Sequence, residues 1–192
     1  MAKINEAVQS VSEVDLADIK RMLAYFIAGR FVKLILTKLR KKHVFRDNIV
    51  HINRFMRSVC ANTDVDRFLI FRLTPDGYSC ILDEQHSDNA VTMYEEFRHV
   101  KVDNGYIDMV NLSINDVVHI KVEELSDSLL KDIYVAQKVY YARIYFLHKY
   151  KNDIFFCSIS TYKHSFLDTL DQEAKISAAV DSIRKAFKAY YN

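Results

Sequence analysis

The side chains best suited to catalysis or metal binding are scattered along this sequence. Its seven histidines contain no H-x-x-x-H or H-E-x-x-H spacing, so no helix is expected to present two of them to one zinc ion. Its three cysteines, Cys60, Cys80 and Cys157, contain no C-x-x-C pair, and no spacing marks a nucleophile with a histidine partner. The sequence therefore predicts no catalytic residue, no metal site and no cofactor, and we do not expect an enzyme.

Glycine is too rare here for the common phosphate-binding loops. The chain has 192 residues but only three glycines, Gly29, Gly77 and Gly105, and one proline, Pro75. A P-loop or a dinucleotide-binding G-x-G-x-x-G loop needs clustered glycines, because the backbone must approach a phosphate closely. Half of the residues are hydrophobic, which also excludes a disordered chain. We expect one folded domain with a long helical appendage.

Charge is divided unevenly along the chain. Residues 19–46 contain no acidic residue, whereas the remainder holds 18 basic and 25 acidic residues, a net charge of −7. A basic segment is therefore joined to an acidic body. The basic segment holds nine lysines and arginines: Lys20, Arg21, Arg30, Lys33, Lys38, Arg40, Lys41, Lys42 and Arg46.

This basic segment falls within a pattern that predicts one long amphipathic helix over residues 12–42. Apolar residues from Ile19 to Ile35 recur at three- and four-residue spacing. The longest apolar run, Met22 to Gly29, is too short to span a bilayer. The same period forms a basic stripe, which we expect to contact a partner, from Arg30, Lys33, Arg40 and Lys41.

The remainder of the chain alternates between helical and extended patterns. Hairpins outnumber crossovers, so we expect an α+β fold with a central, mainly antiparallel sheet and with N- and C-terminal helices on one face. In chain order the expected elements are a helix over 47–61, strands over Arg67–Leu73 and Tyr78–Asp83 joined by a turn at Thr74–Gly77, a short helix over 88–98, a short strand over 106–110, a strand over 117–122, a helix over 127–137 capped by Ser126, paired strands over 139–150 and 154–161, and a final helix opened by the capping box Thr169–Gln172.

One stretch gives this order of elements a familiar form. The strand and acidic step His119–Leu125 leads into the helical Ser128–Ile133, and a long strand, a turn, the strand Ile154–Ser160 and a terminal helix follow. Over residues 46–190 the chain resembles a GAF-type domain of the PAS/GAF sensor class. We therefore expect a helical segment over 1–45 and a GAF-like domain over 46–192.

The resemblance implies a ligand pocket between the sheet and the short helices and loops opposite the terminal helices. The cyclic-nucleotide-binding branch of this class carries an Asn-Lys…Phe-Asp-Glu set that has no counterpart here, and no cysteine lies in a bilin-attachment context. The sequence leaves open whether the pocket is empty or filled by its own aromatic side chains. The residues that we expect to line it are Phe97, Tyr106, Asp108, His119 and Tyr134.

Three partners suit the basic stripe: another protein chain, nucleic-acid phosphates or an anionic membrane surface. Helices that flank GAF-type domains commonly build dimers, so the resemblance favours a protein partner, with nucleic acid next and the membrane last. The three unpaired cysteines and an N-terminus unlike a signal peptide indicate a cytoplasmic location.

The sequence thus predicts a non-catalytic GAF-like binding and assembly module. It would dimerise or dock through residues 12–42 and offer a cavity to a small ligand or a protein segment. One alternative is a structural or assembly component, such as one of a phage, with a degenerate pocket. Another is a nucleic-acid-associated regulator that uses the basic helix.

Overall fold

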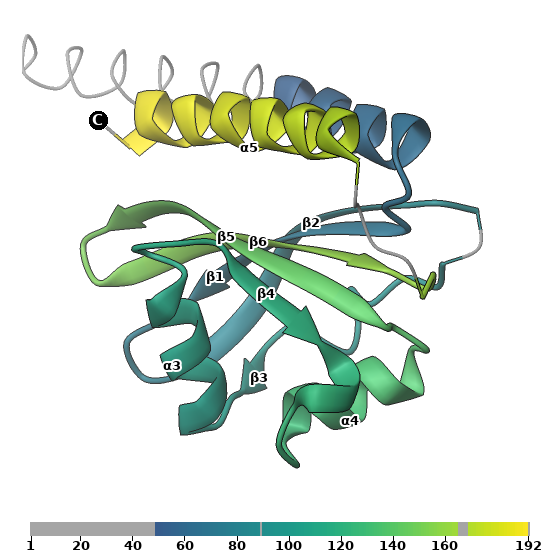
Figure 1. Ribbon diagram of the computed structural model, residues 1–192. Coiled ribbons are helices and arrows are strands. Elements are labelled where there is room, and N and C mark those ends of the chain that lie inside the picture. The colour runs from purple at the N-terminus through teal and green to yellow at the C-terminus, as the bar shows by residue number, and fades with distance from the viewer. Residues whose placement is uncertain (1–48, 89, 165–168, 192) are drawn as a thin grey trace, which may run out of the picture. The chain divides into compact units, whose positions relative to one another are not determined.

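A six-stranded antiparallel sheet lies at the centre of the folded domain (Figure 1). The computed structural model describes residues 49–88, 90–164 and 169–191. The strands follow the order β3-β2-β1-β6-β5-β4, and each neighbouring pair is antiparallel. After a helix over 49–62, the elements are β1 Arg67–Leu73, β2 Tyr78–His86, β3 Val100–Lys101, α3 Asn104–Leu112, β4 Val118–Lys121, a 3-10 turn Val122–Glu124, α4 Leu129–Ala136, β5 Tyr141–Tyr150, β6 Asp153–Thr161 and α5 Leu170–Tyr191.

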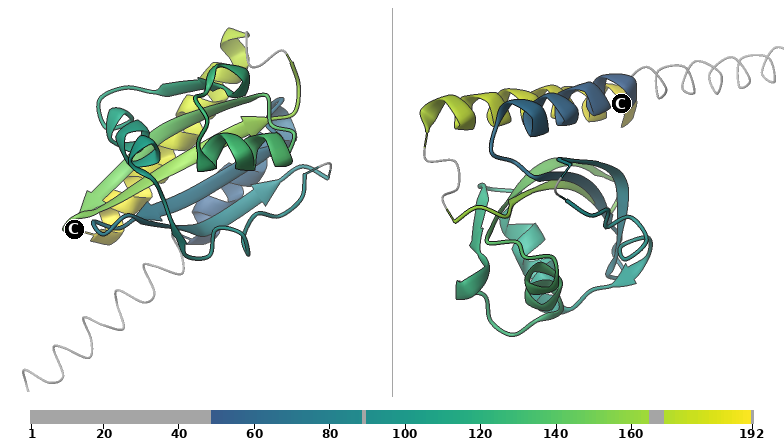
Figure 2. Two further views of the ribbon diagram at one scale, coloured as in Figure 1. Left: turned by 90° about the horizontal axis from the view of Figure 1, so that it is seen from below. Right: turned by 90° about the vertical axis from the view of Figure 1, so that its right-hand side faces the viewer.

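Helices cover both faces of this sheet (Figures 1 and 2). The helix over 49–62 and α5 pack on one face, which we call the helix face, whereas α3 and α4 lie on the opposite one, the pocket face. Met56, Ile176 and Ile183 are fully buried on the helix face. The predicted α+β architecture, with an antiparallel sheet and the first and last helices of the domain on one face, is confirmed.

The spacing of apolar residues explains why α5 packs as it does. Ile176, Val180, Ile183 and Phe187 recur every three or four residues, and all four are buried. Acidic residues stand in its first turn and Lys188 in its last, as the helix dipole favours. One apolar stripe and suitable end charges therefore suffice to place this helix on the sheet.

The β1–β2 hairpin turns where the sequence predicts. The Thr74 N–H donates to the Tyr78 carbonyl at 2.9 Å, and the Gly77 N–H donates to the Thr74 carbonyl at 3.0 Å. Gly77 has a φ of 77°, a conformation that a residue without a Cβ adopts at little cost. This turn is confirmed.

The predicted strand over 106–110 is wrong, because these residues lie within α3. The Asp103 carboxylate accepts a hydrogen bond from the Tyr106 N–H at 2.8 Å and so caps the helix. Tyr106 and Val110, four residues apart, are its buried positions. The cap and the buried pair at i, i+4 spacing therefore favour a helix here, although a short apolar run by itself is also compatible with a strand.

The short helix predicted over 88–98 is also absent from the described part of this segment, which has no regular secondary structure over 90–93 and then a turn at 94–97. Side chains on the strands form hydrogen bonds with backbone groups of this segment instead. The Glu84 carboxylate accepts from the Met93 N–H at 2.9 Å, and Arg67 donates to the Val91 carbonyl at 2.6 Å. These hydrogen bonds hold the segment against the sheet in a non-helical conformation.

The helix predicted over 127–137 begins slightly later, and its cap is Ser128 in place of Ser126. The Ser128 hydroxyl accepts from the Lys131 N–H at 3.3 Å. The predicted helix over 12–42 and its basic stripe lie outside the described residues, so the division of the chain at residue 45 stays a prediction.

Candidate functional site

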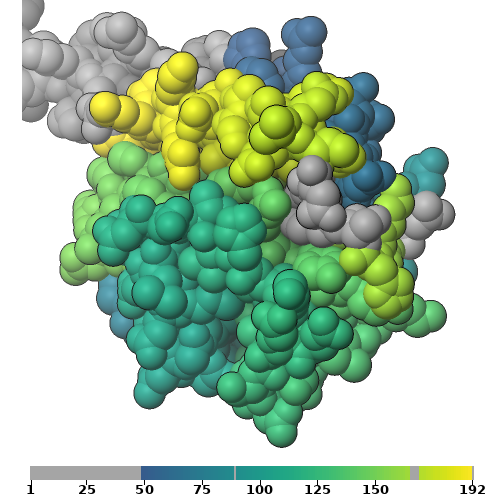
Figure 3. Space-filling view, in the orientation of Figure 1, coloured from purple at the N-terminus to yellow at the C-terminus, as the bar shows by residue number. Residues whose placement is uncertain are grey.

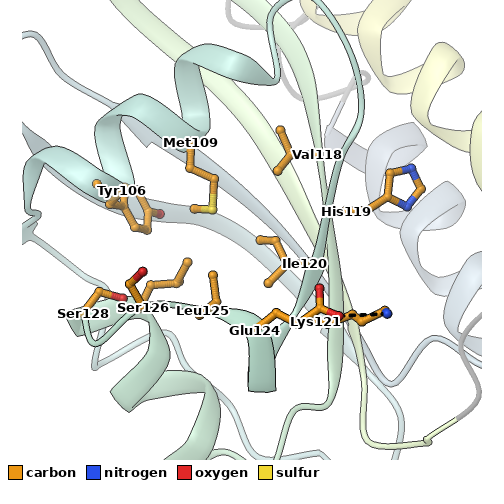
Figure 4. A pocket seen from close by; sticks show the side chains of 12 residues that line it. Tyr106, Met109, Val118, His119, Ile120, Lys121, Glu124, Leu125, Ser126 and Ser128 are labelled. Carbon is orange, nitrogen blue, oxygen red and sulfur yellow. Dashed lines mark hydrogen bonds and ion pairs between the residues drawn. The ribbon is translucent and has the colours of Figure 1, made fainter.

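The five residues predicted to line a pocket separate into three positions. Phe97, Tyr106 and Tyr134 are buried together in the core of the pocket face. Asp108 is exposed on α3. His119 pairs with Arg143 on β5, and its side chain points away from the groove toward the helix face (Figure 4). The structure therefore brings the three aromatic residues together in the core and leaves Asp108 outside, whereas His119 belongs with Tyr106 to the residues that line the groove described below.

Aromatic rings fill the space between the sheet and the short helices. The rings of Phe71 on β1 and Phe156 on β6 stack with centroids 5.1 Å apart. Phe97 meets Phe71 edge-on at 5.6 Å, and Tyr106 meets Phe156 edge-on at 6.3 Å. Side chains of this chain thus occupy the centre of the pocket face, as close packing of a protein interior requires.

Two tyrosine hydroxyls tie the short helices to buried serines of the sheet. Tyr106 on α3 meets Ser79 on β2 at 3.2 Å, and Tyr134 on α4 meets Ser158 on β6, also at 3.2 Å. Burial raises the pKa of both tyrosines, so the hydroxyls stay protonated. Each tyrosine therefore acts as a plug: its apolar ring fills space in the core, and its hydroxyl has a hydrogen-bond partner.

A buried arginine closes the end of the pocket face. The Arg67 side chain is 0% exposed, and its Nε lies 3.7 Å from the Glu84 carboxylate. The guanidinium also donates to the Tyr162 hydroxyl at 2.7 Å. Sequence reasoning missed this residue, although its alternation with Leu69 and Phe71 on β1 is a signal that it faces inward. This network anchors the segment that follows β2 to the sheet.

An open groove remains beside these plugs, between α3, β4 and the start of α4 (Figure 3). Its volume is about 390 Å³, within the range of small-molecule sites. In Figure 4 the side chains of Tyr106, Met109, Val118, Ile120 and Leu125 converge on this space. The groove is lined by Gly105, Tyr106, Met109, Val118, His119, Ile120, Lys121, Glu124, Leu125, Ser126, Ser128 and Leu130.

The polar groups of the groove stand at its rim. Lys121 and Glu124 form an exposed ion pair at 2.9 Å, drawn as a dashed line in Figure 4. Ser128 is engaged as the cap of α4. An apolar floor with a polar rim suits non-covalent binding of an apolar surface and provides no activated nucleophile.

The described residues offer no metal centre, since no three His, Cys, Asp or Glu side chains gather among them. The three cysteines are free thiols. Burial raises the pKa of Cys60 to about 12 and raises the pKa of Cys80 and Cys157 as well. These thiols are therefore poor nucleophiles.

Comparison with known proteins identifies the class of fold. No protein-family model and no curated protein matches the sequence. Among solved structures, the GAF domain of a two-component sensor histidine kinase from Bacillus halodurans is 9% identical, with a TM-score of 0.56 over 72% of this chain and 92% of its own. A red/green cyanobacteriochrome in its red-light-absorbing state is 10% identical, with a TM-score of 0.59 over 74% of this chain and 93% of its own. A phycoerythrobilin-bound GAF domain from a cyanobacterial phytochrome is 13% identical, with a TM-score of 0.51 over 78% and 95%.

The chain therefore has a GAF-type fold, as the order of its elements predicts. One of these similar structures has phycoerythrobilin bound, and another is in a red-light-absorbing state. Within the described ranges, no helix is long and apolar enough to cross a membrane.

Proposed function

We propose that this chain is a non-catalytic GAF-type binding module whose binding site is the groove between α3, β4 and α4. The observation that carries the proposal is the contrast between the two parts of the pocket face. The centre is filled by Phe97, Tyr106 and Tyr134, whereas the groove beside them is open and ligand-sized. Binding at the groove requires no rearrangement of the hydrogen-bonded plugs.

The groove favours a ligand with an apolar surface. Met109, Ile120 and Leu125 supply its wall and floor, and the ion pair of Lys121 with Glu124 lies at its edge. Apolar burial then provides most of the affinity, and the polar rim orients the occupant. A small ligand and a protein segment both satisfy this chemistry.

The proposal includes assembly through residues 12–42, where the basic stripe of Arg30, Lys33, Arg40 and Lys41 stands. The pattern of apolar and basic residues supports a protein partner in preference to nucleic acid. The acidic body also supports this order, because its net charge repels phosphate. A cytoplasmic location is part of the same proposal and rests on the unpaired cysteines.

Filling the groove should abolish binding of a neutral apolar probe. We expect the full-length protein to bind N-phenyl-1-naphthylamine at one saturable site, and Met109→Trp to weaken that binding at least about tenfold, because the indole occupies the groove. The matched control is Asn111→Trp, because Asn111 is exposed and lies about 200° around α3 from Met109. Probe fluorescence measures both affinities. Equal affinity in the wild type and Met109→Trp would place the site elsewhere.

A further inference from the structure

The groove runs along an edge strand of the sheet. In the strand order β4 stands last, with β5 as its neighbour, and all four of its residues, Val118–Lys121, line the groove. Successive side chains of a strand point to opposite faces of the sheet, and Figure 4 shows Val118 and Ile120 on the groove side and His119 on the other. Residues of both kinds can border one space only where that space reaches the strand's edge. The groove therefore extends onto the outer edge of β4.

The pairing of β4 with β5 determines which backbone groups lie on this outer edge. Just past the end of β4, the Val122 N–H donates to the Tyr140 carbonyl at 3.0 Å, in the register that pairs β4 with β5. Backbone groups alternate in direction along an antiparallel strand, so Val122 and the residues two and four before it direct theirs to β5. The N–H and C=O of His119 and the N–H of Lys121 therefore point outward, where no strand of the described residues pairs with them.

These outward backbone groups favour one kind of occupant. Any ligand that covers the edge removes water from them, and a buried donor or acceptor without a partner is unfavourable. An apolar small molecule offers them no hydrogen bond. A peptide in an extended conformation supplies donors and acceptors at the spacing of a strand. Its alternate side chains can at the same time be buried against Met109, Ile120 and Leu125.

Resting on the proposed role of the groove, we propose that its occupant is an extended peptide segment of a partner protein, which adds to the sheet as a strand beside β4. The available edge selects a short peptide over a second folded copy. Four residues provide about 14 Å of edge, and α3 and α4 border the groove, whereas a stable interface between folded proteins buries about 1,200 Å² or more. The opposite edge strand, β3, has only the two residues Val100–Lys101.

The two faces of β4 set the sequence pattern of the peptide. Peptide residues beside Val118 and Ile120 direct their side chains into the groove. The residue between them lies beside His119 and directs its side chain away from the groove, where His119 is itself exposed. The segment therefore alternates apolar and polar residues, and it has no proline at a position that donates to β4.

Amide NMR on the full-length protein tests the pairing directly, with acetyl-Ser-Val-Thr-Val-Ser-amide as the probe peptide. We expect saturable shifts of the His119 and Lys121 amide resonances, while those of α5 on the opposite face of the sheet stay unchanged. Two N-methylated forms of the peptide are matched controls for each other. One carries methyl groups on both valine nitrogens, and the other on the threonine nitrogen and the second serine nitrogen.

The two N-methylated forms should differ because alternate N–H groups of a strand point in opposite directions. In one form the methyl groups replace the donors to β4, and in the other they replace N–H groups that face solvent. We expect the first form to bind at least about tenfold more weakly than the second. This comparison holds the apolar side chains constant, so it isolates the backbone hydrogen bonds.

Proline at position 121 tests the same contact from the protein side. Lys121 has an extended backbone with a φ of −100°, and proline is tolerated on an edge strand where the N–H faces outward. Lys121→Pro removes that N–H, whereas Lys121→Ala removes the same side chain and its ion pair with Glu124 but keeps the N–H. The probe peptide should bind Lys121→Pro at least about tenfold more weakly than Lys121→Ala. The N-methylated peptides provide the test if Lys121→Pro does not fold.

Four results overturn the proposal: no saturable binding of the probe peptide, equal affinities of its two N-methylated forms, equal affinities of folded Lys121→Pro and Lys121→Ala, or the same amide shifts on raising the protein concentration alone, which would place a second copy on the edge. N-Phenyl-1-naphthylamine separates these failures from failure of the proposed function. If the wild type binds this dye, Met109→Trp weakens its binding and the peptide does not bind, the groove is an apolar small-molecule site and the peptide is refuted as its occupant.

Discussion

Replacing Arg67 by methionine should lower the free energy of unfolding by about 3–5 kcal/mol. The guanidinium is fully buried, and its removal leaves the Glu84 carboxylate, itself only 7% exposed in its side chain, without a cation. The change also removes the donors to the Val91 carbonyl and the Tyr162 hydroxyl. Urea unfolding followed by circular dichroism measures the effect, with the slope checked for a two-state transition.

Two further variants identify the buried charge as the cause. Arg67→Met/Glu84→Gln should be more stable than Arg67→Met alone, because no uncompensated carboxylate remains. Arg98→Met removes an arginine that is 74% exposed and 4.0 Å from Glu95, so it should change stability by no more than about 0.5 kcal/mol. A loss below about 1 kcal/mol in Arg67→Met would show that the network does not hold the segment after β2 in place.

Tyr106→Ala should have an effect of similar size, about 3–5 kcal/mol, because it empties part of the packed centre of the pocket face. Tyr106 is 5% exposed, contacts Phe156 and also lines the groove, so its loss joins the groove to a new cavity. For a chain of this size the melting temperature should fall by roughly 10 °C. Tyr106→Phe keeps the ring, loses only the hydroxyl contact with Ser79, and should cost about 1 kcal/mol.

Chemical rescue tests whether Tyr106 is a plug. 4-Methylphenol, the tyrosine side chain as a free molecule, should raise the melting temperature of Tyr106→Ala and leave that of the wild type nearly unchanged. Tyr94→Ala is the control, because that tyrosine is 43% exposed on a turn and its loss should be nearly neutral. If 4-methylphenol does not raise the melting temperature of Tyr106→Ala, the site has collapsed, and the ring of Tyr106 does not occupy a space that a ligand could fill.

The sequence carries most of the information about the fold. Alternation in β4, the Thr74–Gly77 turn and the stripe of α5 each depend on a few neighbouring residues, so local pattern predicts them. The prediction of a strand over 106–110 is wrong because the apolar run is too short to distinguish a strand from a helix. The capping carboxylate of Asp103 favours the helix. The helix predicted over 88–98 failed because the competing partners, Arg67 and Glu84, come from strands earlier in the chain.

The candidate site was less accessible to sequence reasoning. Tyr106, Tyr134 and Phe97 were assigned to the correct side of the sheet, but their role as plugs depends on Ser79 and Ser158, which lie on strands far away in sequence. His119 points to the other face because its strand pairs it with Arg143, while Val118 and Ile120 take the positions in the groove. Met109 was missed because it lies on the helix that the sequence predicts as a strand.

Methionine-methyl NMR gives the most direct test of the central claim, that binding occurs in the groove and not in the filled centre of the pocket face. Three methionines report on separate places: Met109 in the groove, Met93 buried in the pocket-face core and Met56 buried on the helix face. On titration with N-phenyl-1-naphthylamine, the account predicts a saturable shift of the Met109 methyl resonance, while Met93 and Met56 stay unchanged. A shift that begins at Met93, or saturable binding that leaves Met109 unmoved, would contradict it.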